Sequence, residues 1–268
     1  MYYACGGYQI PQLLTHPEVE YDLGRTRSIQ LNCQGIGMES LQIPDAAGVL
    51  RTYDAVASGF NAAPEKLDTS GALVPNHLFE HAQCTLFDIT DWPVQGAPAE
   101  ARPHVVNSPF PQGYVFDVGI AVLDDGAGGS RTVMLGCDSS AGRVLAFDIT
   151  DLPEHFGDPS WSPRLVGQFH VAPNVFGDLH DIPVDIEVDV DDSTGRERVY
   201  AYVAYSRLGL VALEFSFGPV QDTVRMDHVM TLNTPGQAAQ LIIQETQQGK
   251  RALLTDHERL GLRAYGQW

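Results

Sequence analysis

A short phrase that occurs twice constrains the fold of this chain more than any other feature. Residues 85–93 read TLFDITDWP, and residues 144–153 read VLAFDITDLP. Side chains alternate between two faces in each copy, which is the two-residue period of a β-strand. The Asp that follows favours a turn, and the Pro cannot donate a hydrogen bond to a strand ladder. Each copy therefore predicts a strand that stops at a fixed point.

Looser copies of this phrase extend the pattern into a repeat. If one recurring strand position is assigned across the chain, its copies are spaced by roughly 46 to 66 residues. This spacing is somewhat longer than that of typical four-stranded blades, and loops of variable length explain the excess. The aligned residues are Leu41, Phe87, Phe147, Leu213 and Tyr265. The first of them lies in SLQIPD, residues 40–45, which we treat as a loose copy.

The segments before these positions also match one another. Residues 114–150 and 182–216 each predict a strand, a polar hairpin, a strand, a turn and a strand, and residues 238–266 form a shorter version. In this alignment Asp117 falls opposite Asp185. Segments between the units, such as 163–172, predict a fourth, outer strand, whereas 151–159 predicts a turn.

This organisation predicts an all-β fold. We expect a β-propeller of about five four-stranded blades, alone or as part of a larger propeller. The prediction treats residues 1–268 as a single domain. Within it, residues 1–83 are expected to hold irregular, degenerate blades with long loops, and residues 84–268 the clearer repeats.

One segment resembles a known family of repeats. RVYAYVAYSRLGLVALEFS, residues 198–216, is similar to the LVIVD repeat of bacterial and archaeal β-propellers, and residues 131–151 and 251–266 look similar. The resemblance is clearest over residues 114–268 and implies a propeller fold. Glu214 stands where the repeat usually has Asp, and Ala264-Tyr265 replaces a hydrophobic-Asp pair. Because repeats of this kind occur in proteins with many functions, the resemblance transfers no catalytic residue.

Charge and hydropathy exclude some partners. The formal net charge is −18, which argues against a nucleic-acid partner because such proteins need a basic surface. A self-repelling, soluble surface explains this acidity, and binding of metal cations is the alternative. No apolar stretch approaches the ~18 residues of a membrane span. The first residues lack the features of a signal peptide, so we expect a cytoplasmic protein unless the chain is a fragment of a secreted one.

The repeat also predicts where a site would lie. In a four-stranded blade, the loops that lead into the first strand and the turns between the second and third strands share one face. Polar residues that the alignment places there, beside Cys137, are Asp138, Tyr205, Arg207, Asp178, His180, Asp181, Asp256 and His257. Among them His180, His257 and Asp138 suit a divalent metal, which is the only cofactor that the sequence suggests. Ordinary turn chemistry explains polar residues at these places equally well.

Three further patterns have both a structural and a functional interpretation. The four cysteines, Cys5, Cys33, Cys84 and Cys137, form no CxxC pair. We expect them to be small buried residues at a shared blade position, with thiolate ligands or a disulfide as the alternative. His77 and His81 have the spacing of a helical metal site, although helix signals are weak there. Residues 189–197 predict a hairpin tip, with a calcium loop as the alternative.

These observations leave two functions open. The first is a rigid propeller that uses its loop face to bind a protein, a glycan or a small molecule. The second is a metal-dependent hydrolase or oxidase whose site lies at the mouth of the central channel. The sequence does not decide whether the protein is an enzyme.

Overall fold

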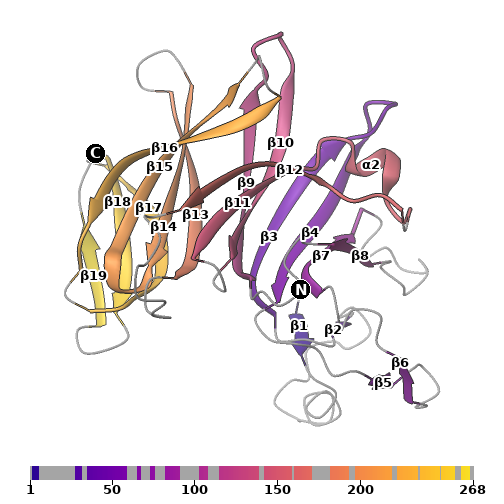
Figure 1. Ribbon diagram of the computed structural model, residues 1–268, viewed down its shortest axis with the longest axis horizontal. Coiled ribbons are helices and arrows are strands. Elements are labelled where there is room, and N and C mark those ends of the chain that lie inside the picture. The colour runs from indigo at the N-terminus through magenta and orange to yellow at the C-terminus, as the bar shows by residue number, and fades with distance from the viewer. Residues whose placement is uncertain are drawn as a thin grey trace. The chain divides into compact units, whose positions relative to one another are not determined.

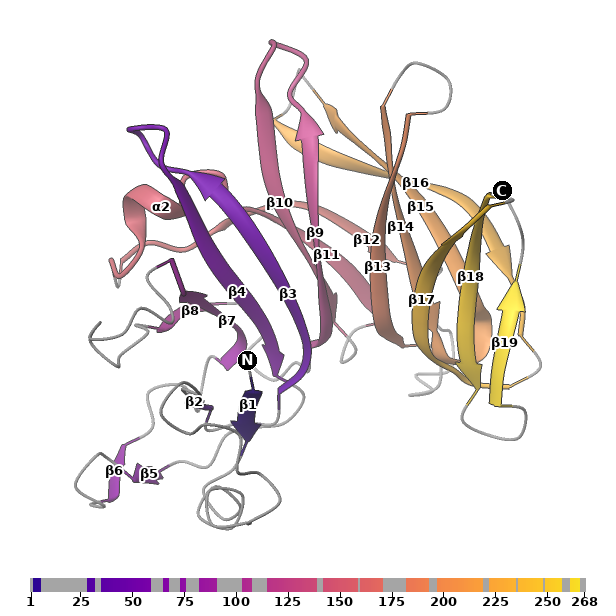
Figure 2. The same cartoon turned by 180° about the vertical axis from the view of Figure 1, so that it is seen from behind.

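A computed structural model describes most of the chain, and Figures 1 and 2 show it from two sides. Most of the described residues lie in β-strands and very few in helices, which confirms the predicted all-β class. Two compact units make up the chain: unit 1 is Met1–Tyr114 with Asp151–Ser162, and unit 2 is Val115–Thr150 with Pro163–Trp268. The described residues are 2–5, 28–31, 35–58, 65–67, 73–75, 82–90, 103–107, 115–138, 142–158, 160–170, 182–192, 197–218, 222–234, 236–247, 249–256 and 261–265.

Unit 1 contains one four-stranded antiparallel sheet in the order β3-β4-β7-β8. Two short pairs, β1 with β2 and β5 with β6, and one helical turn accompany it. The elements are β1 (Tyr2–Cys5), β2 (Ser28–Leu31), β3 (Gly35–Pro44), β4 (Leu50–Ser58), β5 (Glu65–Leu67), β6 (Leu73–Pro75), β7 (Ala82–Asp88), β8 (Pro103–Asn107) and α2 (Leu152–His155).

Unit 2 contains three antiparallel sheets, each built from strands that follow one another in the chain: β9 to β12, β13 to β16, and β17 to β19. The predicted outer strand over 163–172 is present as β12. The elements are β9 (Val115–Asp124), β10 (Ser130–Asp138), β11 (Arg143–Asp148), β12 (Arg164–His170), β13 (Pro183–Asp191), β14 (Arg198–Tyr205), the 3₁₀ turn η2 (Ser206–Leu208), β15 (Gly209–Gly218), β16 (Thr223–Leu232), β17 (Ala238–Thr246), β18 (Gly249–Asp256) and β19 (Gly261–Tyr265).

The first strands of the three sheets in unit 2 are neighbours. Strand β13 lies between β9 and β17, as both views show. At Gly119 the strands approach so closely that a Cβ atom would lie 3.0 Å from the Val188 side chain. Apolar side chains fill the space between successive sheets. One core joins β9–β12 to β13–β16 and includes Leu135, Val203 and Leu213, and a second joins β13–β16 to β17–β18.

The repeated phrase FDIT forms the same local structure in both units. In unit 2, Thr150 Oγ1 accepts the Thr132 amide at 2.9 Å, and the Ile149 amide donates to the Thr132 carbonyl at 3.0 Å. In unit 1, Thr90 Oγ1 accepts the Thr52 amide at 2.9 Å, and the Ile89 amide donates to the Thr52 carbonyl at 2.8 Å. We call this arrangement the Thr lock. It ties the end of each third strand to the second strand of the same sheet.

The hairpin before each Thr lock is repeated as well. Asp125 Oδ1 accepts the amides of Ala127 and Gly129, at 2.8 and 2.9 Å. Asp45 Oδ1 accepts the amides of Ala47 and Val49, at 3.0 and 2.9 Å. An Asp side chain that caps its own turn in this way favours a tight hairpin. DAAGVLRT (45–52) and DGAGGSRT (125–132) are therefore two copies of one hairpin.

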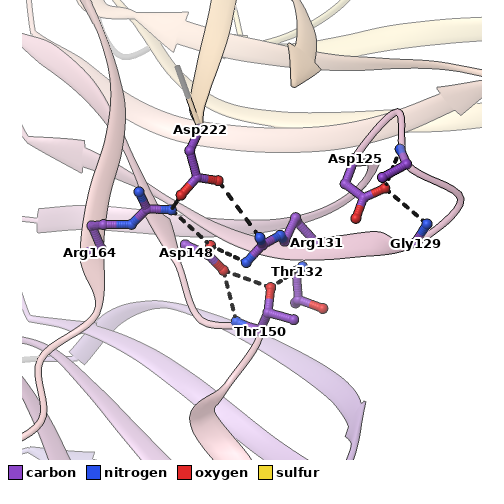
Figure 3. Close-up of polar contacts among 9 residues, drawn as sticks. Asp125, Gly129, Arg131, Thr132, Asp148, Thr150, Arg164 and Asp222 are labelled. Atoms are coloured by element: carbon purple, nitrogen blue, oxygen red, sulfur yellow. Dashed lines mark hydrogen bonds and ion pairs between the residues drawn. The ribbon is translucent and has the colours of Figure 1, made fainter. Parts of the chain in front are cut away.

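An ion-pair cluster surrounds the Thr lock of unit 2 (Figure 3). Asp148 lies 3.2 Å from Arg131 and 3.5 Å from Arg164, and both arginines also contact Asp222 from the turn before β16. In the next sheet Arg198 lies 3.9 Å from Glu214. Glu214 therefore keeps the negative charge that Asp148 has at the corresponding place, although it departs from the LVIVD pattern.

The structure corrects part of the predicted alignment. Leu41 lies on β3, the first strand of its sheet, whereas Phe87, Phe147, Leu213 and Tyr265 lie on third strands. The segment 40–45 thus corresponds to 120–125 and is no copy of the FDIT strand.

The described residues also show how many sheets repeat there and correct one local prediction. The described residues hold four repeated sheets, where about five blades were expected. Residues 35–58 form the β3–β4 hairpin, with a register shift between Gly35 and Met38. Residues 152–155, expected in a turn, form the one-turn helix α2. Pro153 lies in the first turn of this helix. Proline is tolerated there because a backbone N–H in the first turn has no acceptor within the helix.

Candidate functional site

The second strands of the three sheets in unit 2 end at equivalent positions. Asp138 pairs with Val115, Tyr205 with Pro183, and Asp256 with Ala238. Each of these pairs is the last one between the first and second strands of its sheet. Three of the residues that the sequence nominated therefore occupy one repeated strand end, close to where the second strand leads into the turn.

Asp138 is held by an arginine of the next strand. Its side chain is 1% exposed, and its Oδ2 accepts hydrogen bonds from Arg143 Nη2 at 2.9 Å and Nε at 3.2 Å. Arg143 is paired with His170 on β12. Partial burial and the positive charge of Arg143 lower the pKa of His170 from its ordinary value. The buried carboxylate thus has its counter-ion inside the same sheet.

Tyr205 joins two sheets. Its side chain is buried, and its hydroxyl donates a hydrogen bond to the Gly142 carbonyl at 3.1 Å, at the start of β11. The turn that follows carries Arg207, whose side chain is exposed. Gly209 ends this turn with φ +91°, and a Cβ atom there would lie 2.3 Å from the Leu232 carbonyl oxygen. Only glycine fits that position.

Two aspartates of the first strands form a second polar group at this end of unit 2. The Ile186 amide donates to Asp117 Oδ2 at 3.0 Å and to Asp185 Oδ1 at 3.1 Å. The Leu241 amide of β17 donates to Asp185 Oδ2 at 2.5 Å. Burial, followed by the hydrogen bond to Asp185 and its negative charge, raises the pKa of Asp117 to about 9. Each aspartate therefore reaches the first strand of the following sheet.

Cys137 lies beside these carboxyl groups. Its thiol is completely buried, and burial followed by the negative charges of Asp117, Asp185 and Asp138 raises its pKa. Such a thiol is a poor nucleophile and a poor metal ligand, because both roles need the thiolate. Cys84 is also buried, but it lies on the third strand β7 opposite Ala57, so the two cysteines do not share a strand position as expected.

Several nominated residues lie outside the described part of the chain. These are Asp178, His180, Asp181, His257, His77, His81 and Cys33, together with the side chains of Cys5 and Asp256. Within the described ranges, no group of three His, Cys, Asp or Glu side chains is placed to hold a metal ion. Strands β13 and β14 pair up to Asp191 and Arg198, on either side of the predicted hairpin tip, and residues 193–196 of that tip lie outside the described residues. Asp189 is paired with Lys250 of β18.

Sequence reasoning missed the partners that these residues use. The sequence alignment places Asp117 opposite Asp185 but predicts a site role for neither of them, nor for Arg143 or His170. One signal was present: an Asp at the same place in two first strands, where strand interiors disfavour Asp. Nothing in the sequence points to Arg143 or His170, because their roles depend on which strands become neighbours.

The comparisons with known proteins identify no family. No family model and no curated protein matches the chain. Among solved structures it is similar to a candidate phosphatase from Bacteroides thetaiotaomicron, with TM-score 0.41 and 10% identity over 79% of this chain. It is also similar to a candidate 6-phosphogluconolactonase from Bacteroides uniformis, with TM-score 0.35 and 14% identity over 84% of this chain and 70% of that one. The chain spans 42% of the first protein's length. At TM-scores below 0.5 these similarities carry no argument about fold or activity.

Among the described residues, no helix has the length and apolar character needed to cross a membrane. The resemblance to LVIVD repeats stays a prediction, since no family model matches.

Proposed function

We propose that this chain is a propeller-type repeat protein that binds a protein, a glycan or a small molecule at one face. That face is formed where β10, β14 and β18 end, and we call it the strand-end face. The ligand would contact the loops that leave this face, and the sheets would hold the loops in fixed positions. Catalysis is no part of this proposal.

One observation supports it: the described side chains Asp138, Tyr205 and Cys137 at these strand ends are either paired within the fold or buried. Asp138 is held by Arg143, the Tyr205 hydroxyl is bonded to a backbone carbonyl, and the Cys137 thiol is buried with a raised pKa. Groups that are satisfied in this way stabilise a surface and do not attack a substrate. A rigid scaffold with variable loops is the usual arrangement of a binding protein.

The exposed Arg207 offers a direct test at the edge of this face. Purified protein would be screened against an array of glycans and a library of small metabolites, and each hit measured by calorimetry. We expect Arg207→Ala to weaken binding of a true ligand at least several-fold. Arg225→Ala is the matched control, because Arg225 is an exposed arginine on the outer strand β16, and it should leave the affinity unchanged.

Elemental analysis of protein purified without chelators tests the competing interpretation, a metal-dependent hydrolase or oxidase. A stoichiometric transition metal that is lost in both His180→Ala and His257→Ala would overturn the scaffold proposal. A ligand whose affinity falls equally in Arg207→Ala and Arg225→Ala would show that the strand-end face is not the binding surface.

A further inference from the structure

Two carboxyl groups from neighbouring first strands converge on one backbone amide. The Ile186 N–H, on β13, donates both to Asp117 of β9 and to Asp185 of β13. Asp185 in turn accepts the Leu241 amide of β17. We propose that one proton held between Asp117 and Asp185 ties the three sheets of unit 2 together, and that Asp117 carries it.

The repeated strand geometry explains why the amides of Ile186 and Leu241 donate to an aspartate side chain. The ladder between the first and second strands has a register shift between Pro183 and Asp185 in one sheet and between Ala238 and Gln240 in the next. A bulge of this kind disrupts the local ladder. The aspartate of the preceding sheet supplies the acceptor, so each bulge becomes a point of attachment between sheets.

The surroundings allow only one negative charge on the pair. Among the described titratable groups, Cys137 of β10 lies beside the pair, and Asp138, which also lies near Cys137, has Arg143 as its counter-ion. From β17 the contact is the neutral Leu241 amide. Among the described residues no cation is paired with either carboxyl group, and two adjacent, largely buried carboxylates in such surroundings cannot both ionise at moderate cost. The raised pKa of Asp117, about 9, agrees with a proton on that residue at neutral pH.

The two aspartates should respond differently to amide substitution. In Asp117→Asn the side-chain NH₂ can donate to Asp185, as the protonated carboxyl does. In Asp185→Asn the NH₂ would oppose a backbone N–H, because Oδ1 and Oδ2 of Asp185 each accept a different amide. We therefore expect Asp117→Asn to fold and Asp185→Asn to lower the melting temperature. Asp227→Asn, on an exposed strand, is the matched control and should change little.

The pH dependence has a definite sign. Because the pKa of Asp117 is raised in the folded state, its contribution to stability is complete below the ordinary Asp pKa of about 3.9 and declines as the pH rises towards the folded value. Melting temperatures of the wild type and Asp117→Asn would be measured from pH 5 to pH 10. We expect the melting temperature of the variant, relative to that of the wild type, to increase with pH up to about pH 9, and the difference between the two to stay constant at higher pH. A difference that does not depend on pH would overturn the proposal.

A second measurement needs no variant. Protein labelled with ¹³C-aspartate would be titrated by carbon NMR. The proposal requires one aspartate carboxyl that stays protonated at pH 7 and ionises near pH 9. A spectrum in which every aspartate is ionised at pH 7 would overturn it, whatever the variants do.

Discussion

Thr150 Oγ1 accepts a hydrogen bond from the Thr132 backbone amide at 2.9 Å, and its hydroxyl donates to Asp148 Oδ1 at 2.6 Å. Thr90 and Thr52 repeat the first of these bonds at the same distance in unit 1. The same four residues, FDIT, thus build the same contact in two separate units. This recurrence shows that the phrase is a structural signal, which marks where a third strand ends and how it is tied to the second.

Removing the Thr lock should destabilise its sheet. Thr150→Val keeps the shape of the side chain but leaves the Thr132 amide without its acceptor, and Thr132 is buried. We expect the free energy of unfolding to fall by about 1–3 kcal/mol, the usual cost of an unsatisfied buried donor. Urea denaturation followed by circular dichroism would measure it. Thr150→Ser keeps the hydroxyl and should cost clearly less; equal losses in the two variants would mean that the hydrogen bond is unimportant.

The repeat also shows which parts of the fold can be predicted from the sequence. Alternation correctly predicts the third strands that contain Phe87, Phe147, Leu213 and Tyr265, and FDIT marks the end of the first two of them, because strand period and turn chemistry are local properties. The placement of Leu41 is wrong because SLQIPD matches a strand end in hydropathy only. The hairpin signal shared by 45–52 and 125–132 was in the sequence and would have fixed the register.

The candidate site was predicted less completely, for a physical reason. The predicted strand register correctly places Asp138, Tyr205 and Asp256 at equivalent strand ends, because the two-residue period continues along the whole strand. The contacts of Asp117 with Ile186, and of Tyr205 with Gly142, join different sheets. Such contacts depend on how the sheets pack, which no local pattern encodes.

Phe147 tests the core position shared by the third strands. Its side chain is 5% exposed and that of Leu213 is fully buried, as the alignment predicts; the side chains of Phe87 and Tyr265 lie outside the described set. Phe147→Ala should cost roughly 3–5 kcal/mol, the usual penalty for a large cavity in a packed core. Chemical denaturation measures the loss. Phe147→Leu should cost much less, and a loss below about 1 kcal/mol for the alanine variant would mean that the repeat register is wrong.

Tyr205 should contribute through its hydroxyl as well as its ring. Tyr205→Phe removes the bond to the Gly142 carbonyl across two sheets, and we expect the free energy of unfolding to fall by about 0.5–1.5 kcal/mol. Tyr200→Phe is the control, because the Tyr200 hydroxyl meets Arg198 at 3.5 Å on the surface. If both variants lose the same free energy of unfolding, the hydrogen bond between Tyr205 and Gly142 contributes no more to stability than a contact on the surface.

The two Asp-capped hairpins predict a pH effect of the opposite sign to that of Asp117. Hydrogen bonds from the Ala127 and Gly129 amides lower the pKa of Asp125, and bonds from Val49 and Ala47 lower that of Asp45. Because the pKa is lowered in the folded state, the ionised carboxylate stabilises the hairpin at pH values above the ordinary Asp pKa of about 3.9. This stabilisation is lost as the pH falls through the pKa of the folded state. NMR titration of the Gly129 amide should report a midpoint below that ordinary value. Asp125→Asn should abolish the titration; a midpoint at or above the ordinary value would contradict the capped geometry.

The placement of the loops at one end of unit 2 is the central claim, and distances between spin labels test it most directly. Cysteines would be introduced in pairs at Ala127, His180 and His257, with Cys5 and Cys33 changed to serine and the buried Cys84 and Cys137 retained. Ala127 lies in the β9–β10 hairpin, and these strands are about 30 Å long at the usual rise per residue. Pulsed electron resonance should give a 180–257 distance shorter than both the 127–180 and the 127–257 distances. A 180–257 distance that is the longest of the three would place the two loops at opposite ends and contradict the account.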